Sequence, residues 1–444
     1  MGMRRLNSLP ESIYLKLFFL FFSSFFLVAA FCMPDRAQML PGLLRIISQP
    51  TKAYTNFFAV GGYAATFLNM GLVGLICTGF YCIPGDKTNH ASTLVTVLTT
   101  GFGSWGIHIV NMWPPILGVA LYCLLHKKKL GSYSNAMLFA TGLAPFFSEL
   151  FVRYPTPDVV GFRLSGVLLA IIVGLIVGYF LPVGLDSSPR VHRGFALYSA
   201  ALPVGMTAFL MQGVLYKASG IPVPDAIADL SVQSSFIANS FCIALFSSCV
   251  VLALLMGCKL EDYWKLLTDP EPVENFSATY GNAVMLMNVG LYGFTILMYY
   301  NLVGAPFNGV TFGVMFCMLA TCNAGTHPGN IWPIMLGYVA ASYLSRGFSY
   351  LAGGDFVQVL NAQNILVGLC YANGLSTISD KYGWQYGLVA SMLHYFMVTT
   401  VPLLHGDLCL YNGGFTAALV CILMLPPLER MFKAKLERRA SRKK

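Results

Sequence analysis

The sequence predicts an all-α polytopic membrane protein with two inverted repeats, each built from about five transmembrane helices and one re-entrant broken-helix hairpin. Three observations predict this fold: the composition, the length of the apolar segments and an internal repeat. Of the 444 residues, 56% are hydrophobic and only 10% are charged, and the mean hydropathy is +0.67. Soluble domains carry about 25% charged residues. The composition therefore excludes a soluble protein.

The net charge of +9 has a local origin. Eight of the 27 basic side chains lie between Arg430 and Lys444, after the last apolar segment. Basic residues beside a membrane span are typical of the cytoplasmic face, where they meet anionic lipid. We therefore expect the lipid bilayer, and no nucleic acid, as the partner of this tail.

About 20 apolar residues cross a bilayer as a helix. Ten segments meet or approach this length, and they cover residues 12–34, 57–83, 135–151, 160–184, 194–216, 235–257, 276–300, 361–378, 384–403 and 410–428. The first follows Arg4 and Arg5, as a signal peptide would, but it lacks a cleavage site of small residues. We therefore expect an uncleaved first transmembrane helix.

Two further segments do not fit this rule. Residues 91–125 and 307–345 are each too long for one helix and too short for two spans and a turn. Glycine, proline and polar residues interrupt both near the middle. Each segment therefore predicts a re-entrant hairpin, which enters the membrane, breaks and leaves on the same side. Counting either as a full crossing would invert the loops beyond it.

The basic residues in the loops agree with this topology. With the N-terminus in the cytoplasm, 19 lysines and arginines fall inside and 7 fall outside. Such a bias follows the positive-inside rule. The prediction is a multi-pass protein with both termini in the cytoplasm.

The chain also repeats itself at a distance of 219 residues. NMGLVG at Asn69 matches NVGLYG at Asn288, and GIHIVNMWPPILG at Gly106 matches GTHPGNIWPIMLG at Gly325, with 20 identities over residues 56–120. Weaker echoes pair Thr141 with Asn373, Pro182 with Pro402 and Gly194 with Gly414. We expect a first repeat over 12–216, a linker over 217–234, a second repeat over 235–432 and a basic cytoplasmic tail over 433–444.

Five crossings in each copy make the second copy enter from the opposite side, so the repeats are expected to be inverted. The repeated GxHxxNxWP motif lies at the break of each hairpin, where the backbone loses its helical partners. Asn111 and Asn330 can cap the second half-helix, whose first turn accepts proline. We expect the two helix starts, with His108 and His327, to face each other at the bilayer centre.

That geometry favours a solute pathway, because exposed N–H groups bind polar solutes and an imidazole can donate, accept or shuttle a proton. The expected pathway residues are His108, His327, Asn111, Asn330, Trp113, Trp332, Asn69, Asn288, Gly106 and Gly325. The alternative is structural: a histidine or asparagine at a break can simply cap the backbone, an asparagine in a span can join two helices, and a tryptophan can simply pack.

Two carboxylates are candidate ligands for a coupling ion. Glu149 and Asp380 lie near the ends of what we take to be corresponding helices. The alternative for each is an interfacial ion pair, with Arg153 or Lys381.

Other chemistry leaves no signature in the sequence. The twelve cysteines are scattered through apolar segments without metal-ligand spacing, and the phosphate-loop, HExxH and GxSxG motifs are absent. We therefore expect no cofactor, no bound metal and no enzymatic activity.

Through the paired NxGLxG and GxHxxNxWP motifs, most of the chain resembles the bacterial membrane family catalogued as domain of unknown function 1576. The resemblance implies a bacterial inner-membrane protein with a duplicated region and no known activity. We expect a transporter or channel for a small polar solute, with homo-oligomer formation left open. The alternatives are an intramembrane enzyme acting on a lipid or isoprenoid and a structural or sensory membrane protein.

Overall fold

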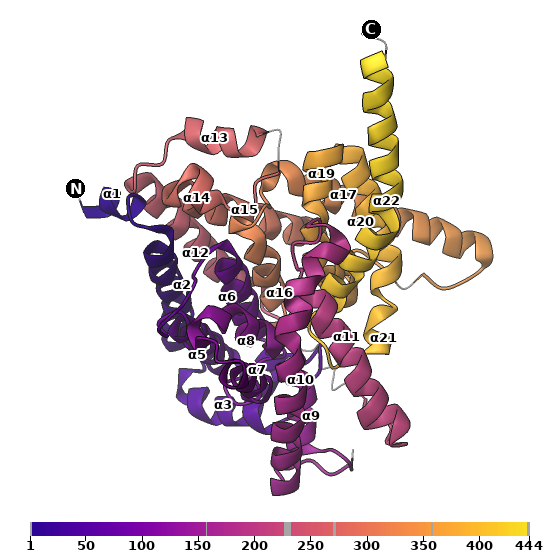
Figure 1. Cartoon of the computed structure of the whole chain (residues 1–444). Coiled ribbons are helices and arrows are strands. Elements are labelled where there is room, and N and C mark those ends of the chain that lie inside the picture. The colour runs from indigo at the N-terminus through magenta and orange to yellow at the C-terminus, as the bar shows by residue number, and fades with distance from the viewer. Residues whose placement is uncertain (1, 157, 226–231, 270–271, 357, 442–444) are drawn as a thin grey trace.

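The computed structural model describes residues 2–156, 158–225, 232–269, 272–356 and 358–441, which form helices and loops and no strand. The helices of the first half, drawn from indigo to magenta in Figure 1, are α1 (Gly2–Asn7), α2 (Glu11–Cys32), η1 (Arg36–Gln38), α3 (Met39–Ser48), α4 (Phe57–Gly61), α5 (Tyr63–Phe80), α6 (His90–Phe102), α7 (Trp113–Leu125), η2 (Leu130–Tyr133), α8 (Ser134–Ala140), η3 (Thr141–Leu143), α9 (Ala144–Val152), α10 (Leu164–His192), α11 (Ala201–Gln212) and η4 (Gly213–Ala218).

The second half follows the same order from rose to yellow in Figure 1. Its helices are α12 (Ser235–Leu255), α13 (Leu260–Thr268), α14 (Phe276–Tyr280), α15 (Asn282–Leu302), α16 (Gly309–Leu319), η5 (Ala320–Asn323), α17 (Pro328–Ala352), α18 (Gln363–Ala372), η6 (Asn373–Leu375), α19 (Ser376–Tyr382), α20 (Trp384–Val398), α21 (Val401–Leu404) and α22 (Asn412–Ser441).

Seven helical segments of the described chain are long and apolar enough to cross a membrane, so the chain is a multi-pass, membrane-embedded protein. They are α2, α5, the η2–α9 segment, α10, α12, α15 and residues 412–433 of α22. Seven of the ten expected spans coincide with them. The other three are shorter or interrupted: 194–216 becomes α11 and the π-helix η4, 361–378 is interrupted at η6, and 384–403 is divided between α20 and α21.

The same local devices start corresponding helices in both halves. Asn89 caps α6 with a capping box, and Asn308 caps α16 with a second one. The side chain of an N-cap asparagine accepts a bond from an N–H group that has no partner in the helix. Gly62 and Gly281, with φ of +89° and +95°, separate α4 from α5 and α14 from α15. A positive φ is favourable for glycine. The two halves therefore repeat in backbone conformation as well as in sequence.

Glycines of the NxGLxG motif let neighbouring helices approach closely. Gly74 of α5 lies against the Ser23 hydroxyl of α2, and Gly293 of α15 lies against the Phe246 ring of α12. A Cβ atom at either glycine would collide with these side chains. Small residues at helix contacts are typical of membrane bundles.

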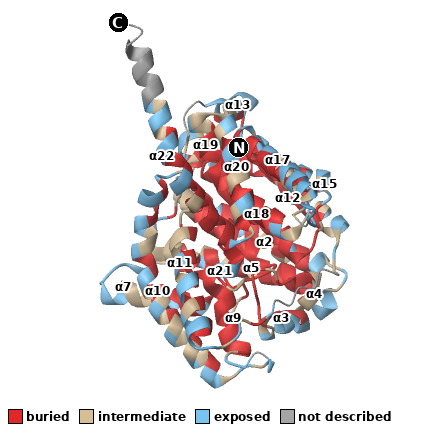
Figure 2. Cartoon of the chain, turned by 90° about the vertical axis from the view of Figure 1, so that its right-hand side faces the viewer, coloured by how far each residue is buried: buried red, intermediate tan, exposed pale blue. Residues whose placement is uncertain are grey.

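The buried helices α6 and α16 run antiparallel through the middle of the molecule. The Ser104 hydroxyl, just after α6, donates to the Gly309 carbonyl at the start of α16 (2.7 Å). At the other end, the Asn323 amide after α16 donates to the Thr93 hydroxyl near the start of α6 (3.2 Å). All residues of α16 and residues 92–102 of α6 are buried, and Figure 2 shows buried ribbon throughout the interior.

The chain that follows each interrupted segment contacts residues near the start of that segment. Gly131, after α7, packs against the backbone of Ile83 and Asp86, before α6. In the second half, the Gln363 side chain after α17 accepts a bond from Asn308, the cap of α16 (2.7 Å).

The two hairpin breaks do not face each other, contrary to our expectation. Because α6 and α16 are antiparallel, the break after α6 lies at the start of α16, and the break after α16 lies at the start of α6. Thr93 and Ser104 are 11 positions apart, which separates these ends by about 16 Å at 1.5 Å per helical residue. Each break therefore lies at the entrance of the other hairpin.

The structure describes the expected linker and tail only in part. The expected linker, 217–234, includes residues 226–231, which lie outside the described chain. The expected tail begins inside α22, which continues unbroken to Ser441.

Candidate functional site

The first break is closed by hydrogen bonds between His108 and Asn111. The Asn111 side chain accepts from the His108 backbone N–H (2.9 Å) and donates to the Gly106 carbonyl (3.0 Å). The Nδ1 atom of His108 accepts from the backbone N–H groups of Val110 and Asn111, both at 3.3 Å. Its Nε2 atom therefore carries the proton, which it donates to the Ser148 hydroxyl of α9 (3.1 Å).

The second break repeats this arrangement with one change. Asn330 accepts from the His327 backbone N–H (3.0 Å) and donates to the Gly325 carbonyl (2.8 Å), while the His327 imidazole accepts from the Gly329 N–H (3.1 Å). The Asn330 amide also donates to the Asp380 carboxylate of α19 (2.8 Å). A carboxylate thus stands at the second break where the first break has the Ser148 hydroxyl.

The intramembrane asparagines Asn69 and Asn288 hold the same breaks from α5 and α15. The Asn69 amide donates to the carbonyls of Gly103 (2.7 Å) and Ile107 (2.8 Å). Asn288 donates to the corresponding carbonyls of Cys322 (2.8 Å) and Thr326 (3.0 Å). The histidines and asparagines are therefore structural partners of the interrupted backbone, whatever other role they have.

We expect Asn69→Ala and Asn288→Ala each to destabilise the protein by about 2–4 kcal/mol. Each change leaves two buried carbonyls without a donor, and each orphaned group costs about 1–3 kcal/mol. Thermal unfolding of the detergent-solubilised protein measures the effect. The control is Asn239→Ala on the exposed face of α12, where the two bonds that are lost, to Asn301 and to the Ser235 carbonyl, are both exposed. Equal effects of all three changes would contradict the role of the two buried asparagines.

The remaining predicted pathway residues lie at different depths. Trp113 and Trp332 are 39% and 44% exposed on the outer surface, and neither is among the residues that line the two pockets described below. Gly106 packs against Leu410, and a Cβ atom at Gly325, whose φ is +116°, would lie 3.5 Å from the Leu197 side chain. The glycines are therefore beside the breaks. The Trp113 indole donates to the Ile109 carbonyl of the first break (2.8 Å), whereas Trp332 packs on Trp384.

The two predicted coupling-ion ligands do not occupy corresponding places. Glu149 is fully buried, and both its oxygens accept from the Arg153 guanidinium, at 2.6 and 2.7 Å. Asp380 corresponds to Ser148, because each accepts from the asparagine of its break. The ion pair that we considered as the alternative for Glu149 is thus present, and Asp380 alone is a carboxylate at a break.

A second repeated motif, PxxHxxxxLY, escaped the sequence comparison. It reads PRVHRGFALY from Pro189 and PLLHGDLCLY from Pro402, at a distance of 213 residues rather than 219. Both copies contain a turn with two consecutive left-handed residues, Arg193 and Gly194 in one and Gly406 and Asp407 in the other. In both, the N–H of the second left-handed residue donates to the proline carbonyl. Pro402 therefore corresponds to Pro189, not to Pro182, and the pairing of Gly194 with Gly414 was also wrong.

Each copy of this motif is hydrogen-bonded to the other repeat. The Leu197 N–H donates to the Gly374 carbonyl (3.1 Å), and the Leu410 N–H donates to the Gly142 carbonyl (3.0 Å). The leucines are those that pack on Gly325 and Gly106. The motif of the first half therefore covers the second break, and the motif of the second half covers the first break.

Two pockets lie at these positions. The large pocket, of about 930 Å³, contains the turn at Arg193 and reaches the second break at Ala324 and Thr377. The small pocket, of about 360 Å³, contains the turn at Asp407 and Lys52. The neighbour of Lys52, Thr51, bonds to the Asn111 amide (3.4 Å) and the Gly106 carbonyl (3.5 Å) of the first break.

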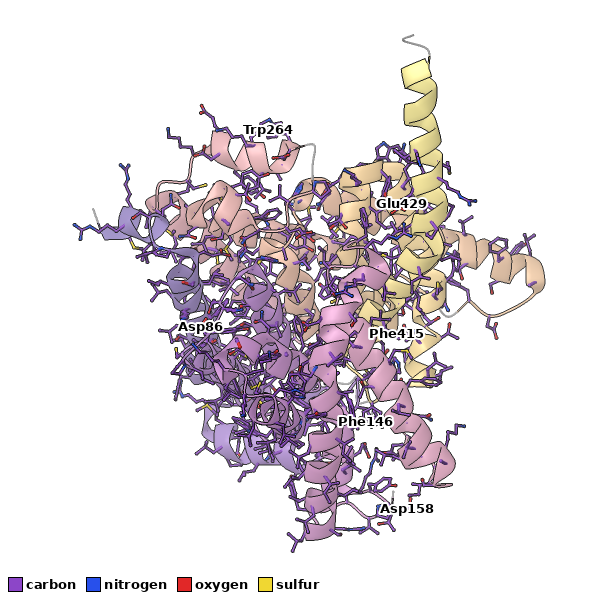
Figure 3. All side chains as sticks on the ribbon, in the orientation of Figure 1. Asp86, Phe146, Asp158, Trp264, Phe415 and Glu429 are labelled. Carbon is purple, nitrogen blue, oxygen red and sulfur yellow. The ribbon has the colours of Figure 1, made fainter. Side chains whose placement is uncertain are left out.

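The pockets therefore lie at opposite ends of the antiparallel α6–α16 pair. Arg193 at the large pocket pairs with Glu429, which Figure 3 labels toward the end that carries α22. Asp158, in the loop after α9, is labelled at the other end of the molecule. Within the described chain, no group of three or more His, Cys, Asp or Glu side chains is placed to hold a metal ion.

Comparison with known proteins identifies a family but no activity. The model of the family described as "protein of unknown function (DUF1576)" matches residues 35–217 and 256–430, which together are well over half of the chain. The two matched segments agree with the duplication. No curated protein and no solved structure matches the chain.

Proposed function

The chain belongs to the DUF1576 family, whose function is unknown, and we propose that it is a transporter that carries a small polar solute across the bacterial inner membrane. The observation that carries this proposal is the pair of pockets, one at each break and at opposite ends of α6 and α16. Discontinuous helices at the interface of two inverted repeats form the substrate site of many transporters, and that site is exposed to each side of the membrane in turn.

The proposal includes inverted repeats with re-entrant hairpins and both termini in the cytoplasm. Antiparallel packing of α6 and α16 supports the inversion, because these helices occupy the same place in the two repeats. The return of each hairpin to its starting point supports re-entry. In this arrangement the large pocket opens to the cytoplasm, beside Lys87, Lys128 and Lys381, as the positive-inside rule requires.

A carrier fits this packing better than an open channel does. Gly101 of α6 and Gly313 of α16 touch backbone to backbone between the two pockets, so the direct route along the helix pair is closed. Solute then passes when the hairpins move relative to the surrounding helices. The hydrogen bonds at the first break resemble those at the second break. Two equivalent arrangements of this kind allow the protein to alternate between two conformations.

Flux through reconstituted proteoliposomes tests the proposal. We expect saturable uptake of at least one solute from a broad panel, and we expect His108→Ala and His327→Ala together to reduce it at least tenfold. His108 donates a hydrogen bond at the first break, and His327 accepts one at the second break. The loss of both histidines therefore disturbs both ends of the pathway. Uptake no greater than that of empty liposomes across the panel would overturn the proposal.

A cysteine experiment separates a pathway defect from a folding defect. In a background with the exposed Cys32 and Cys82 replaced by serine, Ala324→Cys places a thiol in the large pocket at the second break. A bulky, water-soluble thiol reagent should then block uptake by a protein that is already folded. Lys265→Cys on the exposed face of α13 is the matched control, and its labelling should leave uptake unchanged.

A further inference from the structure

The small pocket contains two opposite charges from different halves of the chain. Lys52 lies in the loop before α4, and Asp407 lies in the left-handed turn before α22. The Ala53 N–H donates to the Asp407 carbonyl (2.8 Å), which joins the two loops. Lys52 is only 3% exposed, so its cation is held in the protein rather than in bulk solvent.

Neither charge has a partner among the described residues. No hydrogen bond or ion pair there reaches the Lys52 ammonium or the Asp407 carboxylate, and the two groups do not pair with each other. By contrast, the neighbouring Glu149 and Arg153 satisfy each other. Burial lowers the pKa of Lys52 and raises the pKa of Asp407, and each group opposes the shift of the other. An unpaired buried charge is costly to the fold.

The backbone places Asp407 in a left-handed turn. Its φ is +59°, and the corresponding residue of the other turn is Gly194, with φ of +83°. Aspartate and glycine both adopt this conformation more readily than most other residues do. The two turns therefore have similar backbones, but only the turn at the small pocket has a carboxylate at this position.

The charges of the small pocket also balance. Its charged residues are Lys52, Lys217, Asp225 and Asp407, two of each sign. The large pocket has four lysine or arginine side chains and two carboxylates, and it contains Lys87, Lys128, Arg193, Lys381, Asp186 and Glu274. A neutral ligand that itself carries one charge of each sign matches the small pocket better than a simple anion or cation does.

We propose that the small pocket binds a small zwitterion of the α-amino-acid type, whose carboxylate pairs with Lys52 and whose ammonium pairs with Asp407. Gln212, which is 7% exposed in the same pocket, supplies a further amide. The volume of about 360 Å³ lies at the lower end of the range for ligand pockets, about 300–1,000 Å³. This inference rests on the proposed transport function and names its substrate class.

Binding measurements on the full chain in detergent test the site. The probes are the common α-amino acids, each compared with the same molecule lacking its ammonium and the same molecule lacking its carboxylate. We expect at least one amino acid to bind at least tenfold more tightly than either of its two analogues. Lys52→Gln should abolish the preference over the analogue without a carboxylate, and Asp407→Asn should abolish the preference over the analogue without an ammonium.

Stability without ligand separates a ligand site from a structural pair. Lys52 is buried and Asp407 is partly buried, and neither side chain has a hydrogen-bonded partner among the described residues, so we expect the melting temperature to stay unchanged or rise in both variants. Lys265→Gln and Asp158→Asn, at exposed positions outside the pocket, should retain wild-type binding. Failure of every amino acid to bind, or binding that survives both pocket substitutions, would overturn the site. If those variants still take up other solutes, the proposed transport function is retained and only the zwitterion is rejected as its substrate class.

Discussion

Replacing Gly313 by alanine is expected to destabilise the protein by about 3 kcal/mol or more, and to do so through a single methyl group. A Cβ atom at this position of α16 collides with the Ser104 hydroxyl and with the backbone carbonyl of Gly101, and it lies 2.6 Å from the Trp105 ring. A backbone carbonyl cannot move aside as a flexible side chain can. Overpacking of a well-packed interior typically costs about 1–3 kcal/mol, and more where the backbone must shift.

The control is an alanine at Gly347, in the protruding part of α17, where nothing lies within 4 Å of a new Cβ. That change should stabilise the helix by about 0.5–1 kcal/mol, because alanine loses less conformational freedom than glycine. Thermal unfolding in one detergent compares the two. Equal melting temperatures for Gly313→Ala and the wild type would show that α6 and α16 are not in backbone contact.

The first part of each repeat was predictable because nothing has been inserted there. From Asn56 to Ala120 the two copies keep one spacing, so the motifs around Asn69 and His108 stand out from an apolar background. The local physics is equally readable: asparagine before a helix caps it, and glycine between α4 and α5 allows a positive φ. The helix starts of both hairpins follow from such residues.

The second part was misread because two length changes alter the spacing. Most of the added length is in α17, which continues eight residues beyond position 344, the counterpart of Leu125 at the 219-residue spacing. Ser148 therefore corresponds to Asp380 at a distance of 232 residues. The 29 residues of α10 then correspond to the 15 of α20 and the short α21, and the spacing falls to 213. Comparison at a fixed offset therefore paired Pro182 with Pro402 and missed the motif at His192 and His405.

The position of the breaks was beyond the reach of the sequence for a different reason. A half-helix pattern predicts where the chain is interrupted, but the depth of the break depends on how far α6 and α16 slide past each other. That register is set by contacts between residues far apart in the chain, such as Ser104 with Gly309 and Thr93 with Asn323. The same is true of Lys52 and Asp407, which line one pocket only when the two halves of the chain are packed together.

Replacing Arg153 by methionine is expected to cost about 3–5 kcal/mol of stability. The guanidinium donates two hydrogen bonds to Glu149, whose carboxylate is fully buried. It donates a third to the Asp225 carbonyl (3.3 Å). Removing one member of a buried pair leaves an uncompensated charge, which costs about that much. The loss should appear as a lower melting temperature at neutral pH, and it should shrink where Glu149 becomes protonated.

The double variant Glu149→Gln with Arg153→Met decides what the pair does. If the pair is structural, the second substitution recovers most of the lost stability, because a neutral amide is far cheaper to bury than a lone carboxylate. Uptake should then return with stability, and its dependence on the cation gradient should match that of the wild type. A coupling-ion role for Glu149 requires the opposite: a stable double variant whose uptake no longer responds to the gradient. The two bonds from Arg153, which occupy both carboxylate oxygens, favour the structural outcome and leave Asp380 as the better candidate for coupling.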